Sequence, residues 1–358
     1  CAVPWKLRPL YCCGMQTGVT AESFPARVSF RIRLSGSKAN TSNCSSVSDE
    51  WVYSFVPVYI LSISVLGMAL NIFVLMVFIL HKKSCSVAEI YMGNLAAADL
   101  LLTSFLPFWA VNAWNQFEWK FGLAMCKIVN VAIPMNVYCS IYFLILVSID
   151  RYLALVHPLS HQKLRRPKCA KISCVLVWIL GFVLSLPKLI NRTLDKISCE
   201  EKHDLISLIS DIMFLVFGFF IPISIILFCT IKILQTLGNR FMEEEKTKRK
   251  DRKATTLVLA VLFAFLICWV PYYLLKIPSL LNDFGYLQDC NSRIIMFYCG
   301  QIFMYLGIFN SILNPILYVI VGKNFREKSS QNNGCGSDPV QCRSLFFHLL
   351  FICCFIFV

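Results

Sequence analysis

The chain alternates between long apolar stretches and short polar connections. Seven of the stretches reach about 20 residues or more, the length that an α-helix needs to cross the hydrocarbon core of a bilayer. They cover residues 54–80, 87–113, 124–156, 170–190, 205–236, 254–281 and 294–320. A helix satisfies its own backbone hydrogen bonds in lipid, whereas an open strand does not. The pattern therefore predicts an all-α membrane protein, a bundle of seven transmembrane helices.

The composition agrees with a bilayer as part of the solvent, because hydrophobic residues make up 57% of the chain and charged residues only 15%. The net charge of +14 does not indicate nucleic-acid binding, since the basic residues lie between apolar stretches. Lys and Arg are concentrated in the first, third and fifth connections, so the positive-inside rule places the N-terminus outside the cell. Three N-glycosylation sequences, at Asn40, Asn43 and Asn191, fall on the predicted outer side.

The segments that flank the bundle give weaker signals. We expect residues 1–53 to form an extracellular segment, 54–320 the transmembrane domain and 321–358 a cytoplasmic tail. Residues 323–328 surround Phe325 with charges and predict a short amphipathic helix on the inner leaflet, with Cys335 beyond it as a palmitoylation candidate. Residues 345–358 are apolar but too short to span a bilayer. They indicate either a wrongly assembled sequence or a tail that adheres to the membrane. A wrongly assembled sequence is also an alternative for residues 1–36.

Several polar side chains are predicted to lie inside the bundle, where each needs a partner or a task. Asp99 stands about midway along the second span. Asn136 and Ser140 lie one helical turn apart on the third span, and Asn310 and Asn314 are spaced in the same way on the seventh. Oxygen ligands around one carboxylate suit a small cation such as sodium. The alternatives are a structural polar network without an ion and the proton relay of a transporter.

Three further motifs indicate a conformational switch. Their residues are Asp150, Arg151 and Tyr152 in the third span, Phe265, Trp269 and Pro271 in the sixth, and Asn314, Pro315 and Tyr318 in the seventh. A carboxylate beside a guanidinium forms an ion pair that can be exchanged when a neighbouring helix moves. Each proline removes a backbone hydrogen bond and weakens its helix. Taken alone, the charged pair would be an interfacial pair without a switching role.

Together these motifs resemble those of the rhodopsin-like receptor superfamily, and the resemblance covers residues 71–326. It implies a ligand pocket between the helices on the outer side and a cytoplasmic cavity that accepts a heterotrimeric G protein. Within the superfamily, residues 85–99, 146–156, 254–259 and 318–326 are most similar to bradykinin (kinin) receptors, and angiotensin receptors are the next neighbours. Pro134 stands where the kinin subtype that prefers a shortened peptide has Lys, so the chain resembles more closely the subtype for intact kinins.

The resemblance to kinin receptors implies a short, arginine-bearing peptide agonist and a receptor in the plasma membrane. It also implies coupling chiefly to a Gq-type G protein, which activates phospholipase C and releases calcium. Arrestin is a further candidate partner, although the tail lacks a long Ser/Thr run. Two disulfides follow from the resemblance, one between Cys126 and Cys199 and one between Cys44 and Cys290.

The outer ends of the sixth and seventh spans depart from the kinin pattern. Kinin receptors carry acidic residues there that meet the positive end of the peptide, whereas this chain has Ser279 and Phe297. Nearby acidic residues are candidate contacts for a cationic peptide, unless they are solvated loop charges. Aromatic and amide side chains are further candidates, unless they face lipid. The complete set of peptide-binding candidates is Trp109, Glu201, Asp211, Tyr272, Asp283 and Gln301.

Two other classes of protein also place carboxylates in a membrane. A transporter or channel usually shows internal repeats and discontinuous helices, which the sequence lacks. An enzyme is not indicated, because the sequence has no metal-ligand spacing, no Gly-rich phosphate loop and no plausible Ser–His pair. We therefore expect a receptor that uses no cofactor other than an allosteric sodium ion at Asp99. An angiotensin-like or other peptide is the alternative ligand, and basal activity and oligomeric state stay open.

Overall fold

The computed structural model describes residues 50–80, 86–157, 166–195, 198–202, 205–239, 245–283 and 290–321. Its helices are α1 (Glu50–Leu80), α2 (Val87–Trp114), α3 (Gly122–Leu155), α4 (Pro167–Asn191), α5 (Leu205–Leu215), α6 (Ile221–Asn239), α7 (Glu245–Asp283) and α8 (Cys290–Val321). A π-helical turn, η1 (Val216–Phe220), joins α5 to α6, and the strands β1 (Arg192–Asp195) and β2 (Ser198–Glu201) form an antiparallel hairpin.

Seven helical rods in these ranges are long and apolar enough to cross a membrane, with α5, η1 and α6 together forming the fifth. The prediction of a seven-helix membrane bundle is therefore confirmed. Some helices are longer than the predicted spans, because a helix does not have to end where the apolar stretch ends. The sixth span, for example, was predicted from residue 254, whereas α7 begins at Glu245 and includes a basic first segment.

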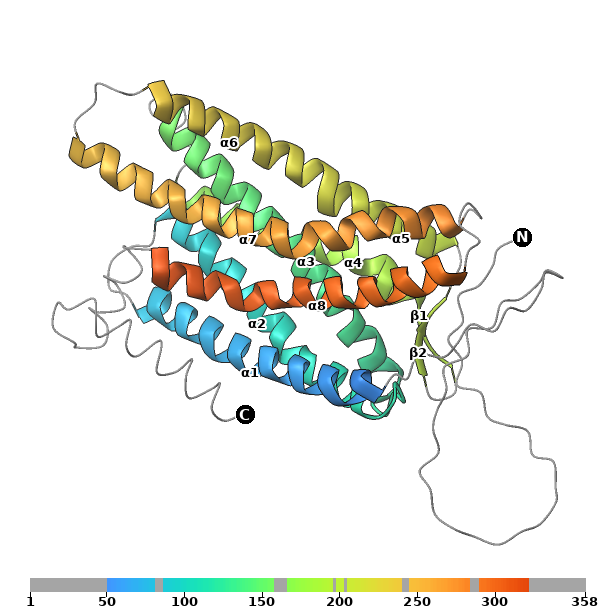
Figure 1. Ribbon diagram of the computed structural model, residues 1–358. Coiled ribbons are helices and arrows are strands. Elements are labelled where there is room, and N and C mark those ends of the chain that lie inside the picture. Colours follow the sequence, from blue (N-terminus) through green and yellow to red (C-terminus); the bar gives the residue numbers. More distant parts are fainter. Residues whose placement is uncertain are drawn as a thin grey trace, which may run out of the picture.

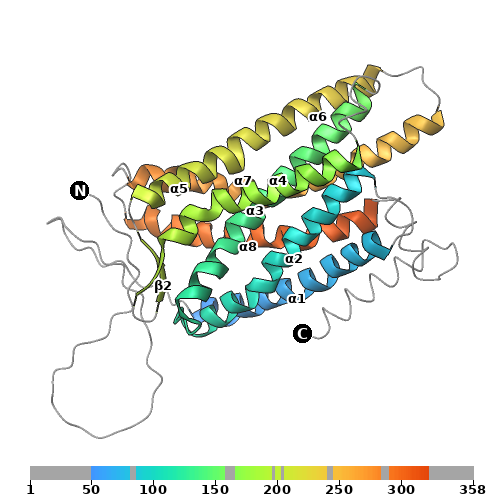
Figure 2. The ribbon, with the colours of Figure 1, turned by 180° about the vertical axis from the view of Figure 1, so that it is seen from behind.

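The helices lie side by side in an elongated bundle (Figure 1). α3 crosses the middle of the bundle and contacts α2, α4, α6 and α7. The β-hairpin lies at one end, beside the last residues of α4, and both views show this arrangement (Figure 2). We call this end the hairpin end, and we call the opposite end, where Arg151 is located near the end of α3, the Arg151 end.

Apolar side chains both fill the bundle and cover its outside. The interior includes Leu95, Phe143 and Trp269, each at most 1% exposed. Along α4, in contrast, Ile172 and Leu176 are about 60% exposed, at 62% and 60%. A contiguous exposed apolar surface of this kind is typical of contact with a membrane.

The fifth span contains an irregular turn where its proline occurs. Pro222 has no N–H group to donate to the preceding turn. The backbone forms the π-helical turn η1 immediately before it, and Ile221 donates its N–H to the Val216 carbonyl, five residues back. The hydroxyl of Tyr142 on α3 donates to the Phe217 carbonyl in this turn, at 3.1 Å. The irregular turn is thus stabilised from a neighbouring helix.

A glycine in the same turn makes room for an aromatic side chain of α7. A Cβ atom at Gly218 would lie 2.7 Å from the hydroxyl oxygen of Tyr273, closer than real contacts allow. The Tyr273 ring stacks between Phe214 and Phe219, with ring centroids 5.0 and 4.9 Å away. Close packing between the fifth span and α7 therefore depends on Gly218.

Some predictions fall outside the described part of the chain. The amphipathic segment 323–328, Cys335, Asn40, Asn43 and Cys44 belong to ranges that the structure does not describe, and the side chains of Asp283 and Cys290 also lie outside it.

Candidate functional site

A buried carboxylate joins three helices in the middle of the bundle. Asp99 on α2 is completely buried, with 0% exposure. One of its oxygens accepts a hydrogen bond from the Asn136 amide of α3 at 3.0 Å, and the other accepts one from the Asn314 amide of α8 at 2.8 Å. The structure therefore brings together these three residues, as the sequence predicts.

Further oxygen atoms in the same region lack hydrogen-bond partners among the described residues. They are Oγ of Ser140 and Oδ1 of Asn310 and Asn314, and all three side chains are buried. Ser140 and Asn310 lie one helical turn from the two residues that bind Asp99. An unsatisfied buried polar atom costs free energy, so each such oxygen needs a donor or a cation. The oxygens and the carboxylate form a donor set that suits a hard cation.

A second amide ties α1 to this region. The Asn71 side chain donates to the carbonyl oxygens of Gly67 on its own helix and Ser311 on α8, both at 2.9 Å. α1, α2, α3 and α8 are therefore linked by polar side chains in an otherwise apolar interior.

The charged pair at the Arg151 end is formed within one helix. The Asp150 carboxylate accepts hydrogen bonds from Nε of Arg151 at 3.1 Å and from its Nη2. The neighbouring Tyr152 hydroxyl lies 3.1 Å from Nε2 of His157, and its ring packs against Phe228 of α6 at a centroid distance of 5.8 Å. Arg151 is thus held by a residue of its own helix.

Trp269 lies at the contact between α7 and α8. It is almost fully buried, and Phe265 and Tyr272 of the same helix have rings 6.4 and 6.1 Å away. A Cβ atom at Gly307 of α8 would lie only 2.8 Å from the indole ring. Trp269 therefore packs directly on the backbone of α8.

The two predicted prolines lie inside α7 and α8, the helices that meet at Trp269. Pro271 lies inside α7, two residues beyond Trp269, and Pro315 lies inside α8. Tyr318, the last residue of the α8 motif, is buried with 1% exposure. The residues of both motifs are thus assembled inside the bundle.

A disulfide fixes the hairpin to the bundle. Cys126 near the start of α3 is bonded to Cys199 of β2, with 5.8 Å between the Cα atoms. The amide of Asn130 donates to the Cys126 carbonyl at 2.8 Å and to the Cys199 sulfur at 3.2 Å. The structure thus contains the pairing of Cys126 with Cys199 that the resemblance implies, whereas the pairing of Cys44 with Cys290 lies outside the described residues.

Charged side chains from several elements meet at the hairpin end. Lys188 of α4 contacts Glu201 at 2.6 Å and Asp211 of α5 at 3.0 Å. Arg192 of β1 contacts Glu201 at 3.4 Å, and Lys276 of α7 contacts Asp211 at 3.3 Å. We call these five residues the ion cluster. Each carboxylate in it already has two cationic partners.

The electrostatics of Glu201 follow from these contacts. Burial acts to raise the pKa of its carboxyl group, but the charges of Lys188 and Arg192 outweigh that effect and hold the pKa below its usual range. Glu201 is therefore ionised and paired at neutral pH.

The ion cluster changes the interpretation of two predicted sites. Glu201 and Asp211 were expected to attract a cationic peptide, yet neither carboxylate is unpaired. Their cationic partners Lys188, Arg192 and Lys276 were not among the predicted site residues. The positions of these three residues in the sequence do not show that they contact Glu201 and Asp211. A lysine at the end of an apolar span could, however, have indicated a partly buried acidic partner.

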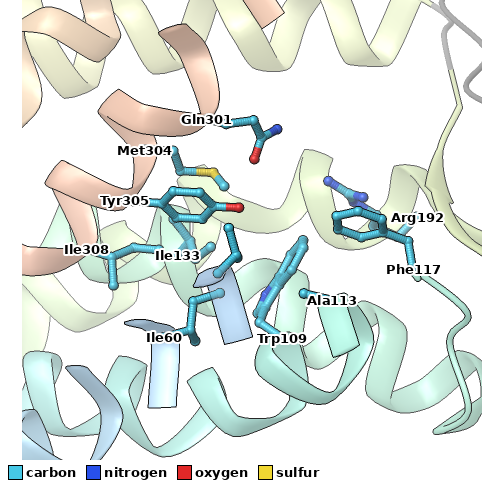
Figure 3. A pocket seen from close by; sticks show the side chains of 11 residues that line it. Ile60, Trp109, Ala113, Phe117, Ile133, Arg192, Gln301, Met304, Tyr305 and Ile308 are labelled. Atoms are coloured by element: carbon cyan, nitrogen blue, oxygen red, sulfur yellow. The ribbon is translucent and has the colours of Figure 1, made fainter. Parts of the chain in front are cut away.

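A cavity of about 220 Å³ opens between α1, α2, α3, α8 and β1. The predicted residues Trp109 and Gln301 line it, together with Arg192. Figure 3 shows Gln301 extending from α8, Trp109 across the cavity from it, and Arg192 beside Phe117. Tyr272 is not among the lining residues and contacts Trp269 and Phe214 instead. Two of the predicted binding residues, Trp109 and Gln301, thus line the cavity.

Asn191, one of the three predicted glycosylation sites, has a buried side chain in the structure. It is the last residue of α4, it is 2% exposed, and its amide donates to the Lys202 carbonyl at 2.6 Å. Glycosylation requires a surface amide. A glycan on this asparagine would have to replace that hydrogen bond and move the side chain out of its buried position.

A bundle of seven membrane-spanning helices with a cavity at one end, an Asp–Arg ion pair at the other and prolines inside the helices between them has the organisation of a membrane receptor. The chain belongs to the rhodopsin family of seven-transmembrane receptors, whose family model matches residues 70–318. It is 40% identical to the human B2 bradykinin receptor, over 94% of this chain and 92% of that receptor. The identity is 43% to the mouse B2 bradykinin receptor, over 82% of this chain and 79% of the receptor.

The human B1 bradykinin receptor is 35% identical to the chain, over 81% of this chain and 85% of the receptor. The resemblance to bradykinin receptors that the helix motifs indicate is thus confirmed over most of the sequence. The identity is higher to both B2 receptors than to this B1 receptor.

Proposed function

We propose that the chain is a G-protein-coupled receptor for a kinin-type peptide, with its N-terminal segment outside the cell. In this proposal the peptide binds at the hairpin end, and the Arg151 end accepts a Gq-type G protein that activates phospholipase C and releases calcium. The similarity to B2 and B1 bradykinin receptors supports the ligand class. The concentration of Lys and Arg in the first, third and fifth connections supports the orientation.

The contact between Gly307 and Trp269 is the observation that carries the signalling proposal. Ile308 lines the cavity, and the adjacent Gly307 packs on Trp269 of α7. A ligand that displaces α8 at the cavity therefore displaces the Trp269 ring as well. Because Pro271 weakens α7 next to that ring, we expect the Arg151 end of α7 to move and Arg151 to exchange Asp150 for another partner.

Calcium release in cells that express the chain tests this function. We expect a response to kinin peptides and a much weaker response to angiotensins, with surface expression confirmed in parallel. A response to angiotensins alone would move the ligand assignment to the neighbouring branch. The Arg151→Ala variant is expected to reach the surface but to lose most of the signal.

We also propose that a sodium ion binds at Asp99. Asn136, Ser140, Asn310 and Asn314 would supply oxygen ligands, as the unpartnered oxygens of the last three residues suggest. The ion would supply a positive charge that neutralises the buried carboxylate. Agonist affinity should then change when sodium is replaced by a large organic cation, and Asp99→Asn should remove that change. An equal sodium effect in both proteins would exclude the site.

A further inference from the structure

A short segment of α7 lies between two prolines at the hairpin end. Pro271 and Pro278 are both inside the helix, and each removes one backbone hydrogen bond and weakens the helix locally. We call residues 272–277, which lie between the two prolines, the outer segment of α7. Because the backbone is weak on both sides of it, the direction of this segment depends on its side-chain contacts with neighbouring helices.

The outer segment contacts the fifth span at two positions. The ring of Tyr273 stacks between Phe214 and Phe219, at centroid distances of 5.0 and 4.9 Å. Nζ of Lys276 lies 3.3 Å from Oδ2 of Asp211. Tyr273 and Lys276 are neighbours on the helix surface, since residues three positions apart lie on the same face. One contact would allow the segment to tilt about it, whereas two contacts hold its direction relative to the fifth span.

Asp211 is itself held from another helix. Its Oδ1 lies 3.0 Å from Nζ of Lys188 on α4, so its two oxygens contact lysines of two different helices. Lys188 also contacts Glu201 of the hairpin at 2.6 Å, and the disulfide of Cys199 fixes the hairpin to α3. The outer segment of α7 is therefore linked through Asp211 to a part of the bundle that is cross-linked in turn.

The pair between Lys276 and Asp211 is partly shielded from water. The two side chains are 24% and 20% exposed. An ion pair on an open surface contributes little because water screens it, and partial burial makes the attraction stronger. Removal of the Lys276 ammonium alone would leave Asp211 paired with Lys188. The contact can therefore be weakened without leaving an unpaired carboxylate.

We infer that Lys276 is a positioning residue for signalling, and that its ion pair with Asp211 anchors the outer segment of α7. With this segment held, a displacement of the Trp269 ring turns the Arg151 end of α7 about Pro271 instead of moving the whole helix. Neither side chain of the pair is among the residues that line the cavity. The pair therefore affects the coupling between the two ends of the bundle. The inference rests on the proposed function as a G-protein-coupled receptor.

Peptide affinity with and without a coupled G protein tests the inference, on membranes of cells that express the full chain. The probe is the kinin peptide, intact or without its last residue, that releases more calcium. Its affinity is measured with an added Gq-type G protein, and again with an excess of guanine nucleotide that uncouples the G protein. The ratio of the two affinities measures the coupling between the ends of the bundle.

Lys276→Met keeps an apolar side chain of similar length and removes the charge. We expect it to reduce the affinity ratio about fivefold, the lower end of typical couplings between sites, and to leave the affinity of the uncoupled receptor unchanged. Lys276→Arg keeps the ion pair and should keep most of the ratio. Lys120→Met is the matched control, because the exposed Lys120 ammonium at the same end contacts Asn115 at 3.1 Å. It should leave both affinities unchanged.

A double-mutant cycle identifies the partner of Lys276. The ion pair is already absent in Asp211→Asn, so adding Lys276→Met to that variant should change the affinity ratio by less than about twofold. Fully additive effects would show that Lys276 acts through a different partner, and the inference would be wrong. Affinities are properties of the receptors that fold, so a lower expression of any variant does not alter the ratio.

The outcomes distinguish the inference from the function on which it rests. If Lys276→Met weakens binding to the uncoupled receptor and leaves the ratio unchanged, or if Lys276→Arg has the same effect as Lys276→Met, the inference is wrong and the receptor assignment stands. If neither kinin binds the unmodified chain despite confirmed surface expression, or if the G protein does not change the affinity, both are wrong.

Discussion

At the scale of single residues, small side chains determine how closely the helices approach one another. Gly307 allows the Trp269 ring to lie against the backbone of α8. Any larger residue at position 307 would require the closely packed ring of Trp269 to move. An interior packed at crystal-like density does not accommodate such a shift without cost.

We predict that Gly307→Ala destabilises the folded receptor by about 1–3 kcal/mol, because the added methyl group overpacks the contact with Trp269. The measurement is thermal denaturation of the purified receptor in detergent. Gly300→Ala is the matched control on the same helix, since a Cβ atom there meets nothing within 4 Å. Equal effects of the two substitutions would show that helix propensity, and not the contact with Trp269, determines the result.

At the scale of helices and strands, the fifth span shows how a local irregularity is stabilised by a neighbour. The π-helical turn Val216–Phe220 changes the alignment of α5 relative to α6, and Tyr142 of α3 binds one of its carbonyl groups. π-helical turns inside α-helices frequently occur at functional positions. Here the turn lies where the fifth span contacts Tyr273 of α7, so its geometry affects the contact between the two helices.

Tyr142→Phe should destabilise the receptor by about 1 kcal/mol, because it leaves the ring in place and removes one hydrogen bond. A thermal shift in detergent measures the difference. Ser104→Ala on α2 serves as the control, since the Ser104 hydroxyl is exposed and donates to the Leu100 carbonyl of its own helix, at 2.7 Å and away from the π-helical turn. A loss in the control as large as that in Tyr142→Phe would contradict a special role for the turn.

The spans themselves were predictable from the sequence, whereas the turn was not. Hydrophobic length alone located all seven rods, since bilayer thickness fixes the minimum length of an apolar helix. A proline such as Pro222 weakens the helix in which it lies, but it is compatible with a kink, a 3₁₀ turn or a π turn. Which of these forms depends on the backbone conformation of the whole span, and the sequence pattern does not determine that conformation.

At the scale of the whole molecule, the ion cluster connects α4, the hairpin, α5 and α7 at one end of the bundle. Sequence motifs placed Asp99, Asn136 and Asn314 together because each occupies a defined position in its span. They did not place Lys188 beside Asp211, because the contact depends on the rotation of two helix ends and on the path of the hairpin. The disulfide between Cys126 and Cys199, which fixes the path of the hairpin, was predicted from the resemblance.

The pairing of Glu201 makes stability depend on pH in a definite direction. Its folded-state pKa is lowered, so its ion pairs stabilise the fold at neutral pH, and this contribution is lost as the pH falls through the lowered value. Glu201→Gln should therefore cost about 1–3 kcal/mol at pH 7 and progressively less below about pH 4, where the unmodified chain also loses the charge.

Thermal denaturation of both proteins at several pH values measures this difference. Glu200→Gln is the control on the same strand, because its carboxylate accepts a hydrogen bond from Ser198 at 2.7 Å. It should change stability by less than about 0.5 kcal/mol. A Glu201→Gln effect that stays constant from pH 7 to low pH would contradict the assigned ionisation.

The ion cluster also limits how this receptor can be recombined with its relatives. A chimera that exchanges α7 alone replaces Lys276 but keeps Asp211, and one that exchanges only the hairpin removes Glu201 and Arg192 but keeps Lys188. Where the donor receptor has an uncharged residue at an exchanged position, the exchange leaves a partly buried charge with fewer partners, at a cost that neither parent protein bears. Grafts at this end should therefore transfer α4, the hairpin, α5 and α7 as one unit, and substitutions at the five positions should be inherited together.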